Sequence, residues 1–193
     1  METVCLRYFN VYGERQNLDG AYSLVIGIFL FQRLNSKPLT IRGNGEQKRD
    51  FTYVGDVVNA NILASSSKKV GFGEVINIGN GDNRSINQIA SYIGGKIKYI
   101  DPVLEPFETL ADNSKAKRLL NWRPKQNVEL WIKSFIDKKI SILSRSLKQD
   151  LLLNTEINDK NKIYIDGQLI GELKGLKFLI EVTSKTLDTD IKS

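Results

Sequence analysis

The chain has 193 residues, of which 41% are hydrophobic, and its formal net charge is +6. This length allows one domain, or a domain with an appendage, and the apolar content suffices for a sizeable core. The absence of histidine excludes histidine bases, Ser-His-Asp triads and histidine-ligated metals. The sequence lacks both a run of roughly 18 apolar residues, as a membrane span needs, and a typical signal peptide, so we expect a cytoplasmic protein.

The positive charge is confined to one part of the chain. Residues 1–140 hold 20 Lys and Arg against 14 Asp and Glu, whereas residues 141–193 hold 8 against 8. A diphosphate ligand would account for some of this excess, and an ordinary solvated surface for the larger share. The single cysteine, Cys5, permits no internal disulfide, and its apolar neighbours Val4 and Leu6 predict a buried thiol.

Short apolar strands and helices alternate in the first half of the chain. Strands are predicted at residues 4–8, 39–41 and 51–54, and apolar residues at three- and four-residue spacing predict a helix over residues 22–34. A second helix follows, with Asp56 at the expected N-cap position.

The alternation continues to about residue 140. The predicted elements are a strand at 75–78, a helix capped by Ser85 and reaching about 92, a strand at 96–100, a helix opening at Asn113 or Ser114 and ending near 122, and a helix over 128–140. Strands and helices that alternate at this spacing indicate an α/β architecture.

Beyond about residue 142 the pattern changes to that of a β-hairpin. Asp166-Gly167 separates apolar runs at 162–165 and 168–173, and a type I′ turn needs the positive φ that glycine adopts freely. Residues 178–182 are expected to add a third strand.

Two motifs carry most of the functional information: residues 6–13 (LRYFNVYG) and 43–54 (GNGEQKRDFTYV). Together they resemble the second half of an NAD-dependent sugar-nucleotide epimerase or dehydratase of the extended short-chain dehydrogenase family, with the UDP-sugar 4-epimerases as the nearest match. The resemblance extends over residues 3–138. It implies the C-terminal part of a Rossmann-type fold, with a substrate-binding part at residues 1–140 and an unrelated small α+β appendage at 141–193.

The resemblance also assigns roles to individual residues. It places Tyr8 and Phe9 against NAD and Asn10 on the sugar nucleotide, where an amide can donate to phosphate oxygens without adding a charge. Arg49 matches the family arginine that clamps the diphosphate, and a planar guanidinium can bind two phosphate oxygens at once. Judged by residue type alone, an arginine beside Asp50 more often forms a surface ion pair.

Further residues are expected to surround the uridine, partly through their backbone: Ser23, Leu24, Thr40, Ile41 and Arg42. Ahead of residues 111–116 (ADNSKA) the family usually has Arg-x-Gly-Asp or Arg-x-Gly-Glu, whereas residues 102–105 here read PVLE. Glu105 keeps the acidic position and is expected near the ribose hydroxyls, although an isolated carboxylate in such a loop is as often only solvated. Because Pro102 replaces the arginine, a second clamp is lost or supplied by another residue such as Arg42.

Two other motifs imitate those of the family. Tyr92 and Lys96 have the Tyr-x-x-x-Lys spacing of the catalytic pair, but Gly94-Gly95 should break the helix between them. The loop at residues 79–84 imitates a dinucleotide-binding loop, but Arg84 replaces its third glycine, and a turn into the next helix is expected. We therefore predict no catalytic residue in this chain, and expect the first half of the family fold, with its glycine-rich NAD loop, to be missing.

The sequence thus predicts the sugar-nucleotide-binding half of an NAD-dependent epimerase acting on UDP-glucose or UDP-N-acetylglucosamine, inactive alone. In complete family members hydride passes from the sugar to NAD and returns, and homodimers are expected. A nucleoside-diphosphate-sugar dehydratase or decarboxylase and a non-catalytic nucleotide-sugar-binding module remain alternatives.

Three interpretations of the tail stay open. It is a small β element that docks on the rest of the chain, the product of a fused or shifted reading frame, or a nucleic-acid-binding segment with a faint resemblance to an accessory segment of some bacterial helicases. Its charge is balanced and it holds one tyrosine, whereas nucleic-acid binding needs a basic face and stacking aromatics.

Overall fold

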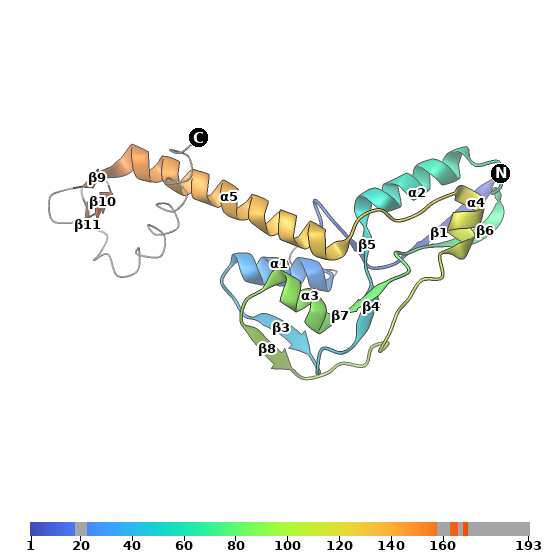
Figure 1. The fold of residues 1–193 in the computed structure, drawn as a ribbon, viewed down its shortest axis with the longest axis horizontal. Helices are drawn as coiled ribbons and strands as arrows, with labels where there is room; N and C mark the ends of the chain where they lie inside the picture. Colours follow the sequence, from blue (N-terminus) through green and yellow to red (C-terminus); the bar gives the residue numbers. More distant parts are fainter. Residues whose placement is uncertain (18–22, 158–162, 166–167, 170–193) are drawn as a thin grey trace. The chain divides into compact units, whose positions relative to one another are not determined.

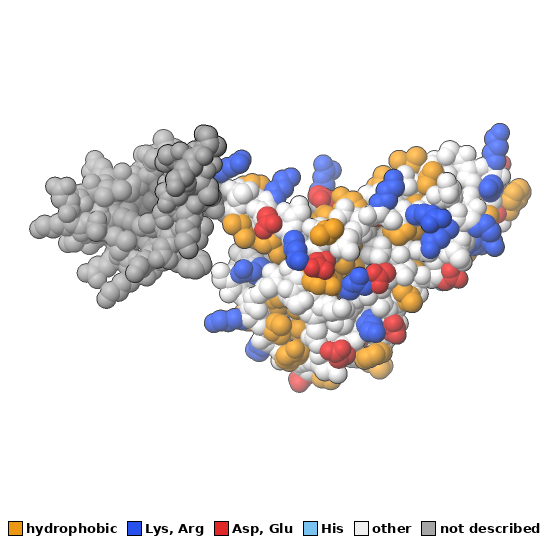
Figure 2. All heavy atoms as spheres, viewed as in Figure 1, with side chains coloured by type: hydrophobic (Ala, Val, Ile, Leu, Met, Phe, Trp, Pro, Cys, Tyr) orange, Lys and Arg blue, Asp and Glu red, His pale blue; other side chains and the backbone are white. Residues whose placement is uncertain are grey.

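The computed structural model describes residues 1–17, 23–157, 163–165 and 168–169 (Figure 1). The chain divides into two compact units, Met1–Phe135 and Ile136–Ser193. On the face seen in Figure 2, Lys and Arg side chains are interspersed with Asp and Glu over the described residues. Such a mixture is typical of a solvated surface.

The first unit is built from pairs of short strands. Three pairs are parallel: β1 (Thr3–Tyr8) with β6 (Phe72–Ile78), β2 (Val11–Tyr12) with β5 (Thr52–Tyr53), and β3 (Leu39–Arg42) with β8 (Ile97–Ile100). One pair, β4 (Lys48–Asp50) with β7 (Asn83–Ser85), is antiparallel.

Helices lie in the crossovers that parallel strands require. The crossover helices are α1 (Val25–Leu34), α2 (Val54–Ser66) and α3 (Ile86–Ile93), and α4 (Ser114–Leu120) follows the last of these strand pairs. In the chain α2 lies between β1 and β6, and α3 lies between β3 and β8. The α/β class predicted from the sequence is confirmed.

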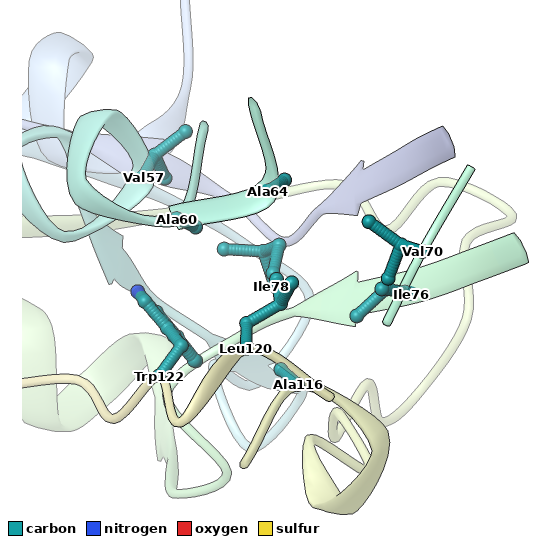
Figure 3. Close-up of a cluster of buried hydrophobic side chains, with 9 residues drawn as sticks. All are labelled: Val57, Ala60, Ala64, Val70, Ile76, Ile78, Ala116, Leu120 and Trp122. Carbon is teal, nitrogen blue, oxygen red and sulfur yellow. The ribbon is translucent and has the colours of Figure 1, made fainter. Parts of the chain in front are cut away.

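A buried apolar cluster joins α2, β6 and α4 (Figure 3). Trp122, just after α4, is fully buried, and its Nε1 donates to the carbonyl oxygen of Asp56 at 2.9 Å. Val4 and Leu6 of β1 pack against the same cluster. The side chains of α2 and α4 therefore meet those of the β1–β6 pair.

Cys5 is exposed, so the predicted burial of its thiol is wrong. Successive side chains of a strand point to opposite faces. Because Val4 and Leu6 both face the apolar cluster, Cys5 between them faces the other side. Its apolar neighbours are thus the reason for its exposure.

The predicted N-cap role of Asp56 is also wrong. Helix α2 begins at Val54, with Tyr53 as N-cap, so Asp56 lies in its first turn. The buried Asp56 carboxylate accepts hydrogen bonds from the backbone N–H groups of Lys125 (3.0 Å) and Gln126 (3.1 Å). It connects α2 to the segment that follows α4.

Other helix boundaries agree more closely with the sequence. Ser85 caps α3 in a reciprocal capping box with Gln88, as predicted, and Asn113 is the N-cap of α4. Helix α1 begins at Val25, later than predicted, and α4 ends at Leu120.

The second unit contains the end of α5 (Val128–Asn154), which continues past the predicted end at 140. The predicted hairpin pairing is confirmed between β10 (Ile163–Ile165) and β11 (Gln168–Leu169). Strand β9 (Thr155–Ile157) adds to the other side of β10. The predicted turn at 166–167 and third strand at 178–182 lie outside the described residues.

Candidate functional site

A cleft of about 460 Å³ opens in the first unit. Arg42 and Ile100, which line it, are the last residues of the parallel strands β3 and β8. The carboxyl ends of parallel strands are where α/β proteins bind ligands, and the volume suits a small molecule. The lining residues are Asn10, Ser23, Leu24, Val25, Ile28, Phe29, Thr40, Arg42, Gln47, Arg49, Phe51, Ile86, Ile100 and Glu105.

Arg49 is the best-fixed cation of this cleft. It lies on β4, and its side chain is only 11% exposed. Nη1 donates to the backbone oxygen of Lys48 at 2.8 Å, and Nη2 lies 2.7 Å from Oε2 of Glu105. The backbone contact fixes the direction of the guanidinium, and Glu105 neutralises its charge.

Gln47 is a cleft residue that the sequence analysis missed. Its Nε2 donates to Oε1 of Glu105 at 3.2 Å and to the backbone oxygen of Arg42 at 3.0 Å. Residues two apart in an extended segment share a face. The position of Gln47, two residues before Arg49, was therefore the signal that could have placed it in the cleft. Both oxygens of the Glu105 carboxylate are therefore hydrogen-bonded within the cleft.

Asn10 stands at the turn after β1 with a φ of 30°. Asparagine is one of the few residues other than glycine that tolerates positive φ. Its Nδ2 donates to the backbone oxygen of Asp50 at 2.9 Å. An amide nitrogen carries two N–H donors, and within the described residues only one of them has an acceptor, so one remains for a ligand.

The predicted uridine-contacting residues differ in their position. Ser23, Leu24, Thr40 and Arg42 line the cleft, whereas the Ile41 side chain is fully buried on the opposite face of β3. Whether Ile41 contributes through its backbone stays a prediction.

Two hydroxyl groups in the cleft wall differ in their partners. Thr40 Oγ1 accepts a hydrogen bond from Gln32 Nε2 at 2.7 Å. The Oγ atom of Ser23 is buried and has no hydrogen-bond partner within the described part of the chain. A buried polar atom of this kind calls for a partner, and a ligand in the cleft would supply one.

Tyr8 and Phe9 do not line the cleft. Tyr8 is 46% exposed, and its hydroxyl donates to Oδ1 of Asn61 at 3.0 Å. The backbone N–H of Phe9 donates to the oxygen of Ile78 at 3.1 Å, which extends the β1–β6 pairing. Their assignment to NAD stays a prediction.

The loop at residues 79–84 binds a carboxylate of the protein itself. Asp50 is fully buried, and its Oδ1 accepts from the N–H of Asn80 at 2.7 Å. Its Oδ2 accepts from Gly81 at 2.8 Å and Ala111 at 3.0 Å. Burial raises the pKa of Asp50, and these hydrogen bonds oppose the rise. Two backbone donors of this loop, those of Asn80 and Gly81, are thus already used and cannot be offered to phosphates.

Tyr92 and Lys96 do not share a helix face. Helix α3 ends at Ile93, and Gly94 follows with a φ of 70°. The helix break predicted at Gly94-Gly95 is confirmed, and the absence of a catalytic pair here stays a prediction.

A third carboxylate, that of Glu14, binds one aromatic residue of β5 and one of α5. It accepts hydrogen bonds from the Tyr53 hydroxyl at 2.8 Å and from Trp131 Nε1 at 2.9 Å. The hydrogen bond to Glu14, together with partial burial, raises the pKa of Tyr53. Burial, together with nearby acidic groups, raises the pKa of Tyr12, whose ring lies 5.2 Å from that of Trp131.

The described residues include no group of three or more Cys, Asp or Glu side chains that could hold a metal ion. They also include no helix that is both long and apolar enough to cross a membrane.

Comparison with known proteins finds a matching family model for part of the chain. Residues 1–79 match the NAD dependent epimerase/dehydratase family. The chain is also similar to the uncharacterized UDP-glucose epimerase YtcB of Bacillus subtilis, to which it is 43% identical over 128 residues, covering 63% of this chain and 39% of that protein.

Relatives with a different activity are also similar. The chain is 42% identical over 104 residues to a UDP-N-acetyl-alpha-D-glucosaminuronate decarboxylase of Bacillus cytotoxicus, covering 48% of this chain and 32% of that protein. The chain spans less than half the length of the curated relatives it matches.

Solved structures of the epimerase family share the fold. The UDP-glucuronic acid 4-epimerase from Bacillus cereus, solved in complex with UDP-glucuronic acid and NAD, matches with a TM-score of 0.60 and 37% identity, over 67% of this chain and 42% of that one. The described α/β unit is therefore part of a Rossmann-type epimerase fold.

Proposed function

We propose that this chain supplies the nucleotide-sugar-binding half of an NAD-dependent epimerase that acts on a UDP-sugar. The observation that carries the proposal is the cleft at the ends of β3 and β8. It contains a backbone-fixed guanidinium, Arg49, and a buried hydroxyl, Ser23, without a partner among the described residues. These residues lie within a chain related to UDP-sugar epimerases, one of which was solved with a UDP-sugar and NAD.

The cleft residues would bind and orient the ligand. Arg49 would contact the diphosphate through Nη2, because hydrogen bonds between a guanidinium and phosphate oxygens are charge-assisted and strong. The free amide donor of Asn10 would reach the same group. The uridine and its ribose would lie among the following residues: Ser23, Leu24, Thr40, Ile41, Arg42 and Glu105.

NAD would supply the redox chemistry by accepting and returning hydride. Tyr8 and Phe9, at the end of β1, are the residues of this chain proposed to contact it. The loop at residues 79–84 does not fit the dinucleotide phosphates, because its N–H groups bind Asp50. We propose that the main NAD contacts come from residues outside this chain and that the chain alone is inactive.

A dehydratase or decarboxylase is the second candidate, and the Bacillus cytotoxicus decarboxylase is the observation that favours it. Product analysis of the complete enzyme would separate the two activities. A cytoplasmic location and a homodimer stay predictions. Turnover of UDP-glucose with NAD by the purified chain would contradict the proposed inactivity.

Calorimetric titration of UDP tests the proposed ligand. Arg49→Ala should weaken binding by about 1.5–3 kcal/mol, as expected for hydrogen bonds to a charged group. The matched control is Arg84→Ala. Arg84 lies opposite Arg49 in the antiparallel pairing of β4 and β7, but it does not line the cleft. Equal loss in both variants would indicate an effect of net charge alone and would contradict the clamp.

A further inference from the structure

We propose that Glu105 occupies an anion position of the empty cleft that a phosphate of the ligand takes on binding. The ligand then has to displace an acidic side chain of the protein, which makes Glu105 a specificity-determining competitor. The inference rests on the proposed function, because it assumes an anionic ligand in this cleft.

The donors around Glu105 form a complete anion-binding arrangement. Arg49 Nη2 binds one carboxylate oxygen at 2.7 Å, and Gln47 Nε2 binds the other at 3.2 Å. The remaining nitrogen of the Arg49 fork, Nη1, donates to backbone oxygens of Lys48 and Phe107. The Arg49 side chain is only 11% exposed. An incoming anion therefore has to compete with Glu105 for the Arg49 guanidinium.

Displacement of Glu105 requires little rearrangement. The Glu105 side chain is 36% exposed, and every residue from 101 to 108 is exposed. Of the two residues that precede Glu105, Leu104 is fully exposed and Val103 is 47% exposed, so neither is anchored in the core. An ion pair that reaches water is weak, whereas a diphosphate brings more charge and more acceptor oxygens than one carboxylate.

The loop that carries Glu105 stays attached when the side chain moves. The Lys48 N–H donates to the oxygen of Phe107 at 2.8 Å, and the Thr109 N–H donates to the oxygen of Lys48 at 3.1 Å. These backbone contacts anchor the loop to β4 just beyond Glu105. One exchange would therefore free Arg49 for phosphate and leave the Glu105 oxygens available to ligand hydroxyls.

The consequence is selectivity by charge. A ligand with a single negative charge gains little over the carboxylate that it replaces, whereas a diphosphate brings more charge and more acceptor oxygens to the donors that Glu105 leaves. The cleft is therefore expected to prefer diphosphates to singly charged ligands.

The test is titration of inorganic pyrophosphate and of UDP into the full chain and two variants. Pyrophosphate has no ribose, so it reports only on the anion position. Glu105→Gln removes the competing charge, and its Kd for pyrophosphate should fall about two- to fivefold, since a partly exposed ion pair contributes modestly. The matched control is Glu108→Gln, in the same loop, where Glu108 binds Asn83 outside the cleft; its Kd should not change.

Unchanged or weaker pyrophosphate binding by a folded Glu105→Gln variant would overturn the inference. Urea unfolding confirms that the variant is folded, and Glu105→Ala repeats the test without a new amide. Tighter pyrophosphate binding together with no UDP binding by the wild type would support displacement and contradict the proposed function. Normal UDP binding by the wild type, without tighter pyrophosphate binding by Glu105→Gln, would support the proposed function and contradict displacement. Binding of neither ligand by any form would contradict both the proposed function and displacement.

Discussion

Two carboxylates near Arg49 differ in how they are held: that of Asp50, the next residue in the chain, and that of Glu105, its ion-pair partner. Asp50 is fully buried and binds three backbone N–H groups, whereas Glu105 is partly exposed and binds two side chains. Backbone donors cannot move without moving strands and loops, but side chains can exchange one partner for another. The same chemical group therefore fixes the scaffold in one region and remains replaceable in the neighbouring region.

The largest effect should follow a change at Asp50. Asp50→Asn keeps the shape but presents an amide N–H to a backbone N–H, so a buried donor loses its acceptor. We expect the free energy of unfolding to fall by about 3 kcal/mol, measured by urea denaturation. Asp82→Asn, at an exposed neighbour, is the control and should change it by less than about 0.5 kcal/mol. If both variants lowered the free energy of unfolding by the same small amount, Asp50 would not be part of a fixed scaffold.

The Glu14 region provides an intermediate case, because its carboxylate binds side chains that are tied into an aromatic cluster. The pKa of Tyr53 is raised above its ordinary value of about 10, so the unfolded chain ionises first as pH rises. The stabilisation is therefore present at neutral pH and is lost as pH rises from about 10 through the folded-state pKa.

Absorbance titration of the phenolates measures this directly. Wild type should show late-ionising tyrosines, and Tyr53→Phe should remove one of them together with part of the alkaline loss of stability. Ionisation of every tyrosine near its ordinary pKa in the folded protein would contradict the assignment.

The smallest effect on stability is expected at Glu105. Glu105→Ala removes a partly exposed ion pair and should lower the free energy of unfolding by no more than about 1 kcal/mol. Parallel urea titrations of this variant and Asp50→Asn would test the comparison. A loss as large as that of Asp50→Asn would mean that Glu105 also belongs to the scaffold and is not readily displaced.

Local signals in the sequence predicted local structure well. Ser85 with Gln88 three residues later is a capping box whose two partners are close in sequence, and α3 begins there. The predicted bounds of α1 and α3 lie within a few residues of those observed. The motif at residues 43–54 correctly directed attention to the cleft, because it contains Gln47 and Arg49.

The errors arose where distant residues decide the outcome. Asp56 binds backbone groups at residues 125 and 126, which local pattern cannot reveal. The exposure of Cys5 depends on which face of β1 meets α2 and α4. The ion pair between Arg49 and Glu105 joins residues 56 positions apart, so the sequence could name both residues but not their mutual neutralisation.

Hydrogen exchange of the full chain with and without UDP tests the central claim most directly, because it reports on both regions in one experiment. The account predicts altered exchange in peptides that cover residues 39–49 and 101–108, which border the cleft. Peptides that cover residues 79–84, whose N–H groups bind Asp50, should stay unchanged. A folded chain with no UDP-dependent change, or with changes confined to regions outside the cleft, would contradict a nucleotide site at Arg49.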